Sequence, residues 1–151
     1  MNREEFIIKC NDKIKLVRTE YDFSQDKMAH ILGLSKKTLV EIEKSRSSLG
    51  WSGSVTLCSI FGDSEILASV FGDKPTEVVM ALAFDGSVPV YRQTGGGKVF
   101  WNQIDEKNGY KLQQNIISQH YRILNPDDMH LGSSFELETI KSRFMEVAEN
   151  G

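Results

Sequence analysis

The chain has 151 residues, of which 40% are hydrophobic and 26% charged, and its formal net charge is −3. This fits one or two small globular domains with a buried core, and no run approaches the about 18 uninterrupted apolar residues of a membrane helix, which excludes a membrane-spanning helix. Residues 1–72 carry ten basic and ten acidic side chains, so the bulk charge gives no support to a polyanion partner, and DNA binding would depend on local charge placement.

The first 20 residues predict a helix with one apolar face. The apolar side chains recur at spacings of four, four and three: Phe6, Cys10, Ile14 and Val17. A second helix begins after Phe23, because Ser24 is a good N-cap and Asp26 suits the positive end of the helix dipole. The capping box of this helix is incomplete, since Lys27 stands where Glu or Gln would complete it.

Residues 24–46 predict two helices that cross steeply. The connection Gly33-Leu34-Ser35 is too short for a shallow crossing, Gly33 supplies the positive φ of the corner, and Ala29 supplies a small residue where the helices touch. The other side chains expected on the inner face are Met28, Leu32, Leu34, Leu39 and Ile42. The pattern A-x3-G-x5-L-x2-I is what a helix-turn-helix requires mechanically.

Residues 52–84 predict three short helices joined by tight corners. Two similar fragments, FGDSEIL from Phe61 and FGDKPTEVV from Phe71, begin ten residues apart. We interpret them as helix boundaries rather than as a repeated functional motif. In each, the glycine would adopt the left-handed conformation that stops a helix, and the aspartate would cap or charge the start of the next. Pro75 fits a first helical turn.

Residues 86–98, GSVPVYRQTGGGK, predict a linker because of their proline, glycine and polar content. Beyond the linker the period changes to that of strands, with turn signals at Asn108-Gly109 and at residues 125–128. The segments expected as strands are KVFWNQI, YKLQQNII and QHYRIL. The pattern predicts a small antiparallel meander.

A C-terminal helix is expected to lie across this meander. Ser133 with Glu136 resembles a capping box, and the apolar residues that follow share one helical face: Leu137, Ile140, Phe144 and Val147. The fold class is therefore α+β. Residues 1–85 form an all-α helix-turn-helix domain with extra helices, and residues 99–151 form a small antiparallel sheet with a helix.

The segment 24–46 resembles the helix-turn-helix of the phage Cro/repressor (XRE) family, whose consensus runs roughly lsqeeLAeklgvsrstiseiErGkr. The matching residues are Ser24-Gln25, Met28-Ala29, Gly33, Ser35, Leu39, Ile42-Glu43 and Arg46. The resemblance covers residues 6–67 and departs from the family at two places. Ser45 replaces the usual glycine after the second helix, which predicts a longer or differently shaped turn, and the residues after Arg46 match only in apolar rhythm.

The resemblance implies that the second helix of the motif is a recognition helix that enters the major groove of DNA. Ser35 would cap this helix and reach a phosphate. Lys36 and Lys37 would be the first exposed positions, where a lysine can donate to guanine O6 or N7. Val40 and Glu41 follow on the same outward side, Val40 to touch a thymine methyl and Glu41 to accept from cytosine or to contact nothing.

Three further residues complete the candidate DNA-binding set. Gln25 resembles the family's phosphate-and-base anchor, Arg46 would clamp the backbone, and Lys44 adds to the local positive charge. Exposed lysines on a helix are ordinarily only a solvated face. We favour DNA contact here because the lysines occupy groove-facing positions and cluster with Arg46 while the remaining surface is neutral or acidic.

These features predict a sequence-specific DNA-binding transcription regulator, a repressor rather than an activator. It would bind double-stranded DNA as a homodimer on a two-fold operator with half-sites about 34 Å apart. The alternative is a protein-interaction or antitoxin-like module that keeps the helix-turn-helix fold without reading DNA, which the zero net charge of residues 1–72 favours. The C-terminal domain would supply dimerisation, a partner surface, or the site of a small-molecule or protein effector.

No enzyme, cofactor or metal is expected. The three histidines, at positions 30, 120 and 130, are not spaced as metal ligands, and Ser133 or Ser134 with Lys141 lacks the Ala-Gly cleavage site of self-cleaving repressors. Four C-terminal aromatic residues could line a ligand pocket or a dimer face, but core packing is favoured: Phe100, Trp101, Tyr110 and Tyr121. Cys10 and Cys58 suit buried thiols in a reducing compartment, so a cytoplasmic protein with no membrane partner is expected.

Overall fold

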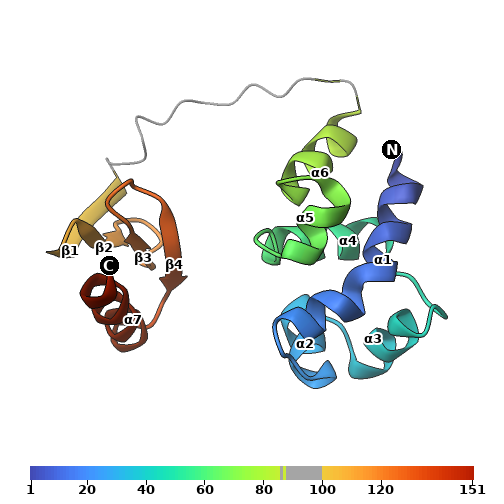
Figure 1. The fold of residues 1–151 in the computed structure, drawn as a ribbon, viewed down its shortest axis with the longest axis horizontal. Helices are drawn as coiled ribbons and strands as arrows, with labels where there is room; N and C mark the ends of the chain where they lie inside the picture. The colour runs from blue at the N-terminus through green and yellow to red at the C-terminus, as the bar shows by residue number, and fades with distance from the viewer. Residues whose placement is uncertain (86, 88–99) are drawn as a thin grey trace. The chain divides into compact units, whose positions relative to one another are not determined.

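The chain divides into two compact units, which we call the helical unit (Met1–Val90) and the sheet unit (Tyr91–Gly151). The computed structural model describes residues 1–85, 87 and 100–151. In Figure 1 the helical unit runs from blue to green and the sheet unit from yellow to red. The predicted linker lies outside the described residues, except for Ser87. The α+β class predicted from the sequence is confirmed.

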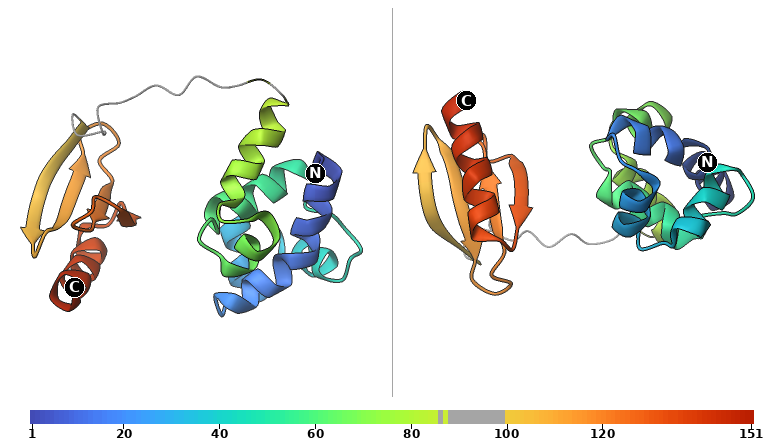
Figure 2. Two further views of the ribbon diagram at one scale, coloured as in Figure 1. Left: turned by 45° about the horizontal axis from the view of Figure 1, so that its top comes forward. Right: turned by 90° about the horizontal axis from the view of Figure 1, so that it is seen from below.

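Six helices form the described part of the helical unit (Figures 1 and 2). Their bounds are α1 (Arg3–Glu20), α2 (Gln25–Leu32), α3 (Lys36–Glu43), α4 (Gly50–Ile60), α5 (Glu65–Phe71) and α6 (Pro75–Phe84). Helix α1 packs against α3, α4 and α5. None of the helices in the described residues has the length and apolar composition needed to cross a membrane.

The buried face of α1 is the one that the spacing predicts. Its four apolar side chains are all 0% exposed: Phe6, Cys10, Ile14 and Val17. Burying a large apolar side chain contributes about 1.5–3 kcal/mol, so this face alone anchors α1 in the unit. The Sγ atoms of Cys10 and Cys58 lie 3.9 Å apart as free, buried thiols. The hydrogen bond to Cys58, together with burial, raises the pKa of Cys10 above its ordinary value.

The three helices predicted between residues 52 and 84 are present, but their caps differ from the prediction. Ser64, not an aspartate, caps α5, and its hydroxyl accepts a hydrogen bond from the Leu67 amide. The carboxylate of Glu20, on α1, accepts a second hydrogen bond at this end, from the Glu65 amide at 2.7 Å. No side chain caps α6, although Pro75 occupies its first turn as predicted.

The two corner glycines also differ from the prediction. Gly62 does not have a positive φ. Gly72 has φ 85° and ψ −157°, which is outside the left-handed helical region. Helix α4 already ends at Phe61, whose φ of −102° and ψ of 38° leave the helical conformation, so no left-handed stop is needed at Gly62.

A four-stranded antiparallel sheet and one helix form the described part of the sheet unit. The strands lie in the order β1 (Trp101–Lys107), β2 (Tyr110–Asn115), β3 (Tyr121–Leu124) and β4 (His130–Ser134), and α7 (Leu137–Asn150) follows. Helix α7 packs across β2, β3 and β4 (Figure 2). The core between the layers consists of Leu112, Ile123, Ile140, Phe144 and Ala148. The predicted meander with a helix laid across it is therefore confirmed.

In the sheet unit, the predicted turn between β1 and β2 is confirmed, whereas the prediction for the segment before α7 is wrong. Asn108 and Gly109 have φ of 54° and 83° and join β1 to β2, as a two-residue hairpin requires. The fourth strand was not predicted, and the capping box of Ser133 with Glu136 is wrong. Ser133 belongs to β4, and Glu136 is the N-cap of α7 without a side-chain hydrogen bond.

Candidate nucleic-acid interface

Helices α2 and α3 are joined by the three residues that the sequence indicates. The Ser24 hydroxyl accepts from the Lys27 amide at the start of α2, and Gly33 ends that helix in the left-handed region with φ 72° and ψ 29°. The amide of Leu34 then donates to the Ala29 carbonyl at 2.8 Å. This is the hydrogen bond that closes a Schellman motif. Ser35 caps α3 directly afterwards, so no free turn of chain separates the two helices.

The inner face of the pair is fully packed. The buried side chains are Met28, Ala29, Leu32, Leu39 and Ile42, with Leu34 partly buried against them. Helix α3 buries Leu39 and Ile42 against the core that includes α1 and α2, so its opposite side is turned outward. An eight-residue helix is too short to be stable alone, and this packing is what holds α3 in place.

A nearly buried ion pair fixes the C-terminal end of α3. The guanidinium of Arg18 donates to the Glu43 carboxylate at 2.7 and 2.9 Å, and the two side chains are only 16% and 4% exposed. Arg18 also donates to the Phe23 carbonyl at 3.0 Å. The amide of Gln25 donates to the second Glu43 oxygen at 3.1 Å. One carboxylate therefore ties α3 to both α1 and α2.

This network was not predicted from the sequence. Arg18 lies off the apolar face of α1, so its position gives no signal of burial, and the only signal at Glu43 is its match to the family consensus. Gln25 was expected to anchor DNA. The structure instead gives its amide nitrogen a hydrogen-bond partner within the protein, so this side chain first positions α2 against α3.

The turn after α3 has the same hydrogen bonds as the end of α2. The amides of Ser45 and Arg46 donate to the carbonyls of Ile42 and Glu41 at 3.0 and 2.8 Å, and Ser45 has φ 60°. The longer or reshaped turn expected from the serine is not found. Serine adopts the left-handed conformation that glycine takes elsewhere, at a cost of about 1 kcal/mol.

Four basic residues lie at the two ends of α3 on its outward side. Lys36 is 56% exposed and forms an ion pair with Asp26 at 3.3 Å. Lys37 is exposed and makes no hydrogen bond or ion pair within the described residues. Lys44 is exposed at the C-cap, and Arg46 is 66% exposed, 3.9 Å from Glu41. The rise of 1.5 Å per residue separates Lys36 from Lys44 by about 12 Å along the helix.

The remaining candidate residues are less available. Val40 and Glu41 are partly buried between the two basic ends. The Ser35 hydroxyl accepts from the Thr38 amide at 3.1 Å and donates its proton to the Thr38 hydroxyl at 2.8 Å. Ser35 thus has no proton left for a phosphate in this state. The structure brings the four basic residues to the outward side of α3, whereas Gln25 and Ser35 are engaged within the protein.

Comparisons with known proteins add no assignment for this arrangement. No protein-family model matches the chain, and neither the curated proteins nor the solved structures contain a match. Within the residues that the structure describes, no three His, Cys, Asp or Glu side chains gather to hold a metal ion. The chemistry of α2 and α3 must therefore be inferred from their own geometry and charge.

The charge at the start of α3 is unusual for a helix. The N-terminal end of a helix carries partial positive charge, so acidic residues are favoured there and lysines are disfavoured. The first turn of α3 contains no acidic residue and begins with Lys36 and Lys37. Asp26 offsets only one of them. The free backbone amides, the helix dipole and two ammonium groups therefore combine into a site with an electrostatic preference for anions.

Proposed function

We propose that the protein is a sequence-specific DNA-binding transcription regulator in which α2 and α3 act as a helix-turn-helix. The observation that supports it best is the outward side of α3, which carries basic residues at both ends while Leu39 and Ile42 fix the opposite side in the core. A helix fits the major groove of DNA, and the phosphates of both strands border that groove. Basic groups at the two ends of such a helix can therefore contact both the base edges in the groove and the phosphates along its sides.

The proposed contacts differ along α3. Lys36 and Lys37 approach base edges or phosphates with the N-terminal end of the helix, and binding requires Lys36 to exchange Asp26 for a DNA acceptor. Lys44 and Arg46 contact phosphates, which fix the register but carry no sequence information. Between them, Leu39 and Ile42 are buried in the core, and Val40 is the apolar side chain that is only partly buried, so it is suited to a thymine methyl.

A homodimer completes the proposal. One eight-residue helix contacts few base pairs, and pairing two copies on a two-fold operator with half-sites about 34 Å apart restores specificity. The sheet unit would supply dimerisation, a partner surface or a response to an effector. Repression in the cytoplasm is the simplest mode of action, because a protein that occludes a promoter needs no further contacts and no catalysis.

Fluorescence anisotropy over a series of salt concentrations tests the proposal. The probes are the duplex upstream of the protein's own gene, a scrambled duplex, and duplexes selected by the protein from a library with random central positions. We expect a selected duplex to bind at least tenfold more tightly than the scrambled one at equal salt. Lys36→Ala/Lys37→Ala should abolish this preference, because the contacts of these lysines with base edges are lost, and should also lower the salt slope, because two cationic groups leave the interface.

The matched control removes two basic groups from the sheet unit. Lys141→Ala/Arg143→Ala changes the net charge by the same amount at exposed positions of α7 and should leave the preference intact. The competing candidate is a protein-interaction module, favoured by the ten basic and ten acidic residues of positions 1–72. That candidate predicts no enriched duplex, a shallow salt slope and the same weak binding for both double variants. Such a result would exclude DNA reading.

A further inference from the structure

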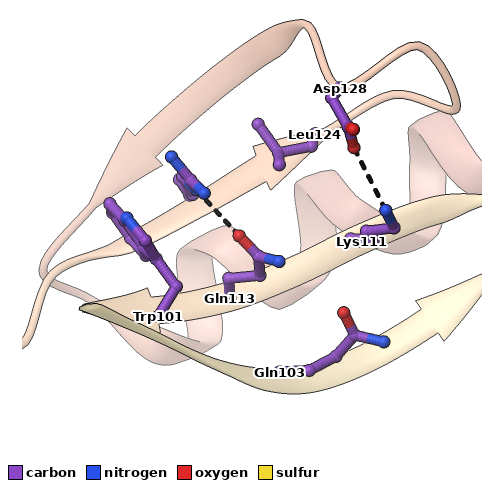
Figure 3. Close-up of a pocket in the computed structure, with 7 residues that line it drawn as sticks. Trp101, Gln103, Lys111, Gln113, Leu124 and Asp128 are labelled. Carbon is purple, nitrogen blue, oxygen red and sulfur yellow. Dashed lines mark hydrogen bonds and ion pairs between the residues drawn. The ribbon is translucent and has the colours of Figure 1, made fainter. Parts of the chain in front are cut away.

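Within the described residues of the sheet unit, no helix covers the face of the sheet opposite α7. Side chains alternate across a strand, so while Leu112 and Ile123 point to the helix, their neighbours point away from it. The residues on this face line a cavity of about 400 Å³: Trp101, Gln103, Lys111, Gln113, Arg122, Leu124 and Asp128. Figure 3 labels six of them, which come from β1, β2, β3 and the connection after β3, and the seventh, Arg122, belongs to β3. The volume lies within the range of small-molecule sites.

Arg122 is held rigidly in this cavity. Its guanidinium carbon lies 3.8 Å from the centre of the Trp101 ring, and its Nε donates to the Gln113 side-chain oxygen at 2.9 Å. Partial burial lowers the pKa of Arg122, while Asp128 opposes this, so the group is partly desolvated and still charged. Its two terminal nitrogens make no hydrogen bond within the described residues. They form the planar fork that matches two oxygens of one anion.

The other polar groups of the cavity favour an acceptor-rich ligand. The Gln113 oxygen accepts from Arg122, so the NH2 group of that amide is the part left for a ligand. The ammonium of Lys111 lies 3.1 Å from Asp128 (Figure 3), and this pair uses one of its three donors. Gln103 donates to Glu106 at 2.7 Å and offers its oxygen to the cavity. Among the described charged side chains of the cavity, Arg122 and Lys111 are cationic and Asp128 is anionic, which leaves a net positive charge that favours an anion.

We propose that this cavity binds a small organic anion through its carboxylate or phosphate group. The two terminal nitrogens of Arg122 grip two oxygens of the anion, and the amide of Gln113 donates to one of them. Leu124, which is 5% exposed, and the edge of Trp101 contact the apolar body of the ligand. The site lies wholly within the sheet unit and is independent of DNA reading by α3.

Titration of the full-length protein by two-dimensional ¹H–¹⁵N NMR tests the site. The probes are benzoate, phenyl phosphate and the neutral analogue benzyl alcohol. We expect saturable shifts of the Trp101 indole and Gln113 amide signals with an anionic probe, at a Kd on the order of 1 mM. Tighter binding of benzoate would identify a carboxylate site, and tighter binding of phenyl phosphate a phosphate site. Benzyl alcohol should produce no saturation.

Two substitutions of Arg122 distinguish the role of its planar pair of donors from the role of its positive charge. Arg122→Gln removes both, and Arg122→Lys keeps the charge but loses the planar pair of donors; each should weaken binding at least tenfold. Arg143→Gln, an exposed change of the same charge on α7, is the control and should bind as wild type. Unchanged α7 signals establish that the variants are folded. The proposal is wrong if Arg122→Lys binds as wild type, if benzyl alcohol matches the anions, or if no probe saturates.

Discussion

The two units bury apolar surface in different ways. Among the described residues, the helical unit has fourteen buried core residues, whereas the core of the sheet unit has five between two layers. Large apolar side chains of the sheet unit remain exposed, notably Ile117 at 72% and Phe135 at 74%. A thick core makes a rigid base for the basic side of α3. In the described part of the sheet unit, no helix covers the sheet face opposite α7, and that face carries the proposed anion site.

The largest loss of stability should come from a substitution in the smaller core, that of the sheet unit. Phe144 is 1% exposed and is the largest of the five core residues, so Phe144→Ala should lower the free energy of unfolding of the sheet unit by about 3–5 kcal/mol. A small unit has about 5–15 kcal/mol in total, so most of its stability would be lost. Urea unfolding followed by NMR should show the sheet-unit signals disappearing while those of the helical unit persist.

The control for this substitution is the next residue. Met145 is 40% exposed, and Met145→Ala should change the unfolding midpoint by much less. Loss of both units together in Phe144→Ala would contradict the comparison, because it would mean that the two units unfold as one cooperative system.

A somewhat smaller effect should follow from breaking an ion pair in each unit. Arg18→Met leaves the Glu43 carboxylate, 4% exposed, without its partner and should destabilise the helical unit by about 3 kcal/mol. Arg143→Met removes a 3.3 Å pair with Glu146 whose side chains are 55% and 61% exposed, and should cost less than about 0.5 kcal/mol. Thermal unfolding by circular dichroism measures both.

The double substitution Arg18→Met/Glu43→Leu sharpens this test. It removes both charges, so it should recover much of the stability lost in Arg18→Met. Equal losses in the single and double variants would show that the packing of the Arg18 stem, rather than an uncompensated carboxylate, accounts for the effect.

Local signals allowed much of the helical unit to be predicted. The face of α1, the cap at Ser24 and the corner at Gly33 each depend on residues within a few positions of one another. The network of Glu43 with Arg18 joins positions 25 residues apart, and the cap that Glu20 provides to α5 spans 45. A sequence contains no sign of which distant charge will meet which, so these contacts required the structure.

In the sheet unit, a pattern typical of a helix start led to a wrong prediction at a segment that forms a strand. Strand β4 has the sequence His-Leu-Gly-Ser-Ser, in which only Leu131 is a large apolar residue. It therefore lacks the alternation of apolar and polar side chains that is typical of a strand. Ser133 with Glu136 has the spacing of a capping box, and that pattern suggested a helix start where pairing with β3 forms a strand. The proposed anion site could not be predicted from the sequence, because its residues come from three strands and a connection, and the sequence does not specify the register of those strands.

The smallest expected change in stability comes from substituting Lys37, the residue for which we propose a role in DNA binding. Lys37 stands at the positive end of α3 without a partner in the described residues, so Lys37→Glu should stabilise the helical unit by about 0.3–1 kcal/mol. Lys27→Glu is the matched variant, because it reverses the same charge at the start of α2 and completes the capping box with Ser24. Both should raise the melting temperature slightly.

The two variants should differ in DNA binding. Lys37→Glu should weaken binding of the selected duplex at least tenfold, since it places a carboxylate against the groove, while Lys27→Glu should lower affinity only through its effect on long-range charge. If Lys37 lowers the stability of the helical unit but is needed for DNA binding, its role is the contact with DNA. If both variants are stabilised and bind equally well, α3 carries a solvated face, and the basic residues at its ends have no role in reading DNA.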